Sequence, residues 1–218
     1  MLVDKLIYDV KERLRAQSAD AVIVNARILH LIDVLRAKYI RQHQQRNPGE
    51  TKVEYTQTMF FDLERVDRSY LPATVKIEKE VLRTVKALPR LVGRHFYKNI
   101  EIRPVDRISQ EIEEVDKTRA IYAPSVAPPN FIFAFRDDDQ YLYFIGDDTI
   151  HLTLKRVAVT AILEVPTEIV AINNLTVELS DYPLPEHMWS IMLPELMEGL
   201  YKELNITQDV VDDNKSVQ

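Results

Sequence analysis

The segment from Asn25 to Arg46 constrains the fold most, because it has the periodicity of a long helix and a local charge opposite to that of the whole chain. Its apolar side chains recur every three or four residues and so share one helix face: Ile28, Leu31, Ile32, Leu35 and Tyr39. Beyond Asp33 every charge is positive, although the chain carries a net charge of -6. We expect this helix to pack through its apolar face and to contact a partner through its cations, which are Arg36, Lys38, Arg41 and Arg46.

Two further helices are predicted at the ends of the chain. Residues 3–15 alternate apolar and charged side chains with helical spacing, and a short connection then leads to residue 25, which predicts a helical hairpin. A last helix is expected from about Pro185 onward, with a kink or a break at Pro194 because proline lacks the backbone N–H that a helix interior needs.

The middle of the chain has the pattern of β-strands. Residues 51–66 alternate polar with bulky apolar side chains, and residues 131–136, 140–145 and 149–165 are separated by Asp and Gly turn residues. The simplest topology for the latter three is a meander in which each strand pairs with the next. Residues 107–118 are expected to form a loop containing one helical turn.

The fold class expected from these patterns is α+β, with an N-terminal helical hairpin and a C-terminal helix around a central antiparallel β region. The expected division is a helical hairpin over 1–50, a mainly β domain over 51–183 and a helix over 184–205 that packs on the helical part. Residues 206–218 are polar and acidic and are expected to form a flexible tail.

No catalytic, cofactor or metal site is expected. The chain has no cysteine and only four dispersed glycines, which excludes thiolate chemistry and glycine-rich phosphate loops. The aspartates at 137–139 and 147–148 suit hairpin turns better than an EF-hand, and none of the five histidines has zinc-pair spacing. A weaker alternative is a glycoside hydrolase that uses Glu113 and Glu114. No apolar run approaches the roughly 20 residues that span a bilayer, so we expect no membrane contact.

The cations of residues 25–46 leave three interpretations open. They could neutralise nucleic-acid phosphates, dock on an acidic protein surface, or lie in solvent and complement the helix dipole. The acidic balance of the whole chain argues against a broad nucleic-acid surface.

The order of several segments resembles a known family of structural proteins. LIYDVKERL is followed by RILHLIDVLRAKYIRQHQQR and TMFFDLERVDRS, then by the proline-rich bend PSVAPPN before FIFAF, and finally by DYPLPEHMWSIMLPELMEGL. This order resembles the head-to-tail neck proteins of crAss-like and related short-tailed bacteriophages, over nearly the whole chain.

The resemblance implies a non-enzymatic virion protein, assembled in the host cytoplasm, that forms a homo-oligomeric ring of about twelve copies as an adaptor. Such a ring docks under the portal protein, contacts further tail proteins and passes DNA through a central channel without reading its sequence. The alternatives are a more distal tail hub or ring, or a DNA-binding regulator that uses the basic helix over 25–46.

In a ring, different patches of neighbouring subunits meet head to tail. The resemblance therefore makes Arg36, Lys38, Arg41 and Arg46 a candidate interface to the portal or to the adjacent subunit. The acidic tail residues Asp209, Asp212 and Asp213 are the complementary candidate surface.

Overall fold

The computed structural model describes ten stretches of the chain, and the following description is confined to them. They are residues 2–18, 23–47, 53–66, 80–92, 100–105, 111–122, 131–137, 139–146, 152–173 and 181–204. They form a layer of helices and a β-sheet, which confirms the α+β class.

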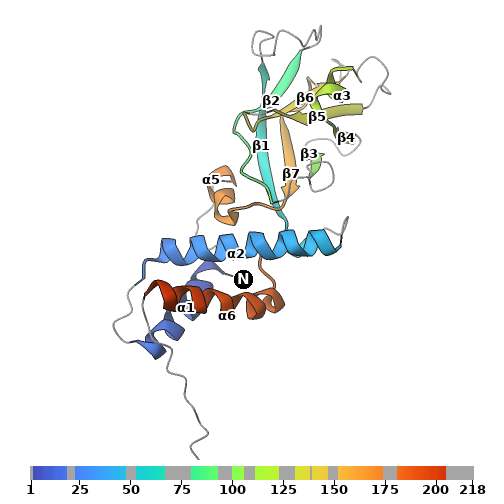
Figure 1. Cartoon of the computed structure of the whole chain (residues 1–218). Coiled ribbons are helices and arrows are strands. Elements are labelled where there is room, and N and C mark those ends of the chain that lie inside the picture. The colour runs from blue at the N-terminus through green and yellow to red at the C-terminus, as the bar shows by residue number, and fades with distance from the viewer. Residues whose placement is uncertain are drawn as a thin grey trace, which may run out of the picture.

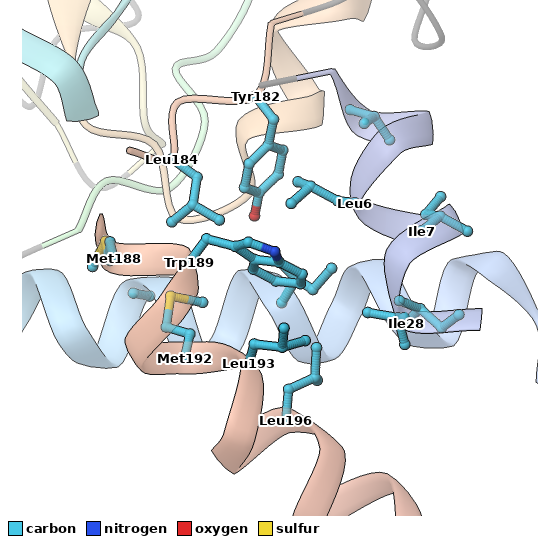
Figure 2. Packing of buried hydrophobic residues seen from close by; sticks show 14 of the residues in the cluster. Leu6, Ile7, Ile28, Tyr182, Leu184, Met188, Trp189, Met192, Leu193 and Leu196 are labelled. Carbon is cyan, nitrogen blue, oxygen red and sulfur yellow. The ribbon is translucent and has the colours of Figure 1, made fainter. Parts of the chain in front are cut away.

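Three long helices share one hydrophobic core. They are α1 (Val3–Gln17), α2 (Asn25–Arg46) and α6 (Glu186–Glu203), and the first two confirm the predicted helical hairpin. Figure 1 shows α2 between the sheet on one side and α1 and α6 on the other. In Figure 2, Leu6 of α1 and Leu193 of α6 point toward Trp189 at the centre of this core.

The buried face of α2 is rotated from the one expected. Ile28 and Ile32 are fully buried as predicted, whereas Leu31, Leu35 and Tyr39 pack only at the edge of the core. The remaining buried positions of the helix are Asp33, Arg36, Ala37 and Ile40.

A kink or a break was expected at Pro194, and the last helix continues through this residue without a break. Pro194 lies on the exposed side of α6. The carbonyl that loses its helical partner at this position can therefore bond to solvent, which makes the proline tolerable.

The sheet contains seven described strands in the order β3-β7-β1-β2-β6-β5-β4. Their bounds are β1 (Gln57–Val66), β2 (Val81–Thr84), β3 (Glu101–Pro104), β4 (Glu111–Glu114), β5 (Phe131–Arg136), β6 (Leu142–Gly146) and β7 (Arg156–Ala161). The long strand β1 pairs with β7 through residues 57–62 and with β2 through residues 63–66. Because the end strands β3 and β4 also lie close together, the sheet curls around a second apolar core.

The expected pairing of successive strands is found for one pair of strands and not for the next. The hairpin of β5 and β6 is confirmed, but β7 pairs with β1 and β3 instead of continuing the meander. The reason lies in burial, since Val157 and Val159 of β7 stand opposite Phe61 and Met59 of β1 and all four side chains are buried. This pairing completes the core beneath β1.

The segment 107–118 was expected to form a loop, and its described part, residues 111–118, differs from that expectation. Residues 111–114 form β4, which pairs parallel to β5, so the sheet is mixed and not wholly antiparallel. The sequence of β4 is EIEE. Three charged residues in four positions are typical of a solvated loop, but they are also common in a strand at the edge of a sheet. A short helix, α3 (Lys117–Tyr122), begins only at the end of this segment, and its Ala120 is buried against the outer face of β5 and β6.

Short helical turns complete the described structure. They are η1 (Val53–Tyr55) before β1, and η5 (Pro166–Glu168) and α5 (Ile169–Asn173) after β7. Among the described residues no helix is long and apolar enough to cross a membrane.

Candidate functional site at the junction of the helices and the sheet

Arg36 of α2 is the central residue of the junction between the helices and the sheet. Its side chain is 0% exposed and donates three hydrogen bonds to backbone carbonyls: Nε to Pro183 at 2.9 Å, Nη1 to Leu163 at 2.8 Å and Nη2 to Tyr55 at 3.0 Å. Tyr55 precedes β1, Leu163 follows β7 and Pro183 precedes α6. One guanidinium thus joins three chain segments that connect the two parts of the subunit.

The charge of Arg36 is balanced indirectly through Tyr182. The guanidinium carbon lies 5.8 Å from the centre of the Tyr182 ring, and the Tyr182 hydroxyl donates to Oδ1 of Asp33 at 2.5 Å. Burial lowers the pKa of Arg36 from its ordinary value, and it raises the pKa of Asp33 to about 6. Burial also raises the pKa of Tyr182, so this side chain remains a neutral donor.

The Asp33 carboxyl gives the junction a measurable pH dependence. In the unfolded chain its pKa is about 3.9, so between roughly pH 4 and 6 the folded state binds more protons than the unfolded state. The free energy of unfolding should therefore fall as the pH rises through this interval, by about 1–3 kcal/mol from this group, and then level off.

The substitution Asp33→Asn should remove that fall, because a neutral amide still accepts the Tyr182 hydrogen bond. Urea unfolding of both proteins from pH 4 to 7 gives the comparison. Glu114, whose pKa burial raises to about 7, is common to both proteins and cancels. Parallel curves for the two proteins would refute the assignment.

The predicted cationic face is mostly neutralised within the subunit. Lys38 Nζ lies 2.6 Å from Glu195 Oε1 of α6, and Arg41 Nη2 lies 2.6 Å from Glu164 Oε1 after β7. Arg46 is exposed and forms no ion pair with any described residue. Asp209, Asp212 and Asp213 lie outside the described residues.

Arg36 requires a correction. It is fully buried and bonded to its own chain, so it does not belong to an exposed cationic surface. The sequence does carry a signal for this position, because Arg36 continues the row of Ile28, Ile32 and Ile40 at four-residue spacing. A cation in line with buried apolar residues indicates a paired, buried charge.

The carboxylates and histidines that fall in the described stretches do not form one cluster. Asp139 accepts the backbone N–H of Tyr141 at 3.0 Å in the turn between β5 and β6, as predicted for a turn residue. Within the described stretches no group of three or more potential metal ligands occurs. Asp138, Asp147, Asp148, His95 and His151 lie outside those stretches.

The acidic pair considered for glycoside chemistry lies on β4. Glu113 is 3.3 Å from Arg119 in an ion pair, and neither Glu113 nor Glu114 lines the groove described next.

A groove of about 860 Å³ opens beside the junction. Its lining comes from the start of β1, from α5 and from residues 181–187, and it includes the carboxylates of Glu54, Asp181 and Glu186. Neither lysine nor arginine occurs among the residues that line it.

Comparison with known families identifies the kind of protein that carries this junction. The model of the family described as phage tail ring protein 2 matches residues 5–217, which is nearly the whole chain. The chain belongs to the phage tail ring protein 2 family. No curated protein matches it.

Membership of the phage tail ring protein 2 family makes this chain a virion structural protein that assembles with other tail components. The resemblance to phage neck proteins is thereby confirmed at the level of a tail ring protein. For such a protein the relevant sites are contacts between subunits and the junction that fixes its two parts to each other.

Proposed function

We propose that this chain is a head-to-tail adaptor whose copies close into a ring beneath the portal and leave a channel for DNA. Its membership of the tail ring family carries the proposal. The Arg36 junction supports it. A subunit held between two other components needs a fixed orientation of its helical part relative to its sheet, and the three hydrogen bonds of Arg36 hold the two parts together.

The mechanism of such an adaptor is assembly and not catalysis. Each copy contributes one patch to the next copy and receives a different patch from the previous one, so a closed ring is stabilised when all contacts form together. Twelve copies would match the symmetry implied by the resemblance to neck proteins. The net charge of -6 suits a channel through which polyanionic DNA slides without binding.

Lys38, Arg41 and Arg46 remain the proposed contact to the portal or to a neighbour, without Arg36. Arg46 is the strongest of them, since Lys38 and Arg41 already face carboxylates of their own subunit. The proposed partners of this surface within the ring are Asp209, Asp212 and Asp213 of the tail.

A more distal tail ring is the second candidate, because the family description names a tail ring and no portal. Co-expression with the portal protein of the same phage, followed by sedimentation of the complex, separates the two. An adaptor co-sediments with the portal as one large particle. A chain that assembles with other tail proteins but never with the portal belongs to the distal tier.

A DNA-binding regulator makes a different prediction for the same purified protein. It would bind duplex DNA with an affinity that falls steeply as salt increases. We expect no such binding, because the positive charges at two of the four candidate positions are paired within the subunit and a third is buried.

A further inference from the structure

The groove beside the junction is lined by acidic side chains and by neither lysine nor arginine, so a partner with positive charges would complement it. Glu54, Asp181 and Glu186 are exposed at its walls and form no ion pair with any residue in the described part of the chain. Between them lie Pro183 and Pro185, which are half-buried and give the groove an apolar wall. Its occupant should therefore combine an apolar centre with positive charges around it.

The outer face of α1 has the complementary chemistry. Tyr8 is 63% exposed, more than Phe60, the other aromatic side chain among the exposed large hydrophobic residues of the described stretches, which is 39% exposed. Lys5 and Lys11 lie one helical turn to either side of it, and neither forms an ion pair with a described residue. Asp4 and Glu12 are exposed at the neighbouring positions, but Glu12 is paired with Arg15, so the two unpaired lysines outnumber the unpaired Asp4. Tyrosine is enriched at the centres of protein interfaces, because it combines a large apolar ring with a hydroxyl donor.

In a single copy an antiparallel bridge between Leu2 and Asp181 brings the start of α1 to the edge of the groove, but Tyr8 does not line it. Leu6, Ile7 and Val10 of α1 are buried against α2 and α6, so Tyr8 is on the side of α1 that faces away from that core. The groove, by contrast, is built from the start of β1, from α5 and from the segment before α6. Two different, complementary patches that do not contact each other within one subunit are what a head-to-tail contact between identical subunits requires.

We propose that Tyr8 of one copy, flanked by Lys5 and Lys11, occupies the groove between Glu54 and Glu186 of the next copy in the ring. This inference rests on the proposed ring function, and it adds a second contact between neighbouring copies to the one proposed for the cations of α2. The lysines meet the groove carboxylates, and the tyrosine ring packs on the proline wall.

Cysteine cross-linking tests this contact directly, because the natural chain has no cysteine. One batch of the full chain carries Tyr8→Cys and a second carries Glu186→Cys, both at exposed positions. After mixing, co-assembly with and without the portal, and mild oxidation, the mixture should give a disulfide-linked dimer that neither batch gives alone. A mixture of Tyr8→Cys with Lys155→Cys, an exposed residue before β7, is the matched control and should remain uncross-linked.

A charge exchange supplies a second readout. Lys5→Glu with Lys11→Glu should lower the assembled fraction at least about tenfold, because like charges would face each other across the contact. Adding Glu54→Lys with Glu186→Lys to the same chain should restore assembly, whereas Lys155→Glu alone should leave it unchanged.

The possible failures are distinguishable. Normal rings without a cross-link in the mixture overturn this contact and leave the ring function intact. A dimer formed by Tyr8→Cys alone indicates a symmetric contact and also overturns it. A wild-type chain that stays monomeric with and without the portal overturns the contact and the ring function together.

Discussion

Replacing Arg36 with methionine should lower the free energy of unfolding by at least about 3 kcal/mol, since three backbone carbonyls, two of them in buried hydrogen bonds, lose their donor at once. Those carbonyls belong to Tyr55, Leu163 and Pro183, and the Arg36 side chain that serves them is 0% exposed. Methionine fills much of the same volume, so the loss reports the hydrogen bonds more than a cavity.

Urea unfolding monitored by circular dichroism measures this loss. Arg41→Met is the matched control, because the Arg41 ion pair with Glu164 is about half exposed on the arginine side. Such surface pairs contribute only about 0–1 kcal/mol. Equal free energies of unfolding for the two variants would show that the hydrogen bonds of Arg36 do not stabilise the junction.

Trp189→Ala is expected to cost about 3–5 kcal/mol, the range for removing a large aromatic side chain from a core. Trp189 is 8% exposed and lies at the centre of the core that α1, α2 and α6 share. Its Nε1 also donates to Oδ2 of Asp9 at 3.0 Å, which ties α6 to α1. The loss should therefore loosen the helical part that carries Tyr8.

Far-UV circular dichroism during urea unfolding gives the free energy of this variant, since it lacks the only tryptophan for fluorescence. Ile191→Ala on the same helix is the control, because Ile191 is 57% exposed and its loss should change stability by no more than about 0.5 kcal/mol. A Trp189→Ala protein within about 1 kcal/mol of the wild type would show that this core does not hold the helices together.

The helices could be predicted because their signals are local. The spacing of apolar residues set the predicted bounds of α2 at the residues observed, and α1 differs only at its C-terminal end. The order of the strands could not be predicted in this way. Val157 and Val159 of β7 pair with strand β1, about 100 residues earlier, and nothing in the intervening turns specifies that choice.

The contacts of the candidate interface could not be predicted either, because they also join residues that are distant in the sequence. The run of cations in α2 is plain in the sequence, but the acids that neutralise it are distant: Glu195 lies 157 residues from Lys38 and Glu164 lies 123 residues from Arg41. The groove and its exposed complement on α1 depend on which segments meet in space. Among these residues, only the burial of Arg36 could be predicted from the local sequence, because Arg36 lies in the row of buried isoleucines.

The central claim is that copies of this chain close into a ring. Electron microscopy of the purified full chain, alone and with the portal protein, combined with native mass measurement of the particles, tests it most directly. The expected result is a closed, rotationally symmetric ring with a central channel and a mass that is a whole multiple of the 25.4 kDa chain, twelvefold if the neck resemblance holds. A protein that remains a monomer at all concentrations, with and without the portal, would contradict the claim.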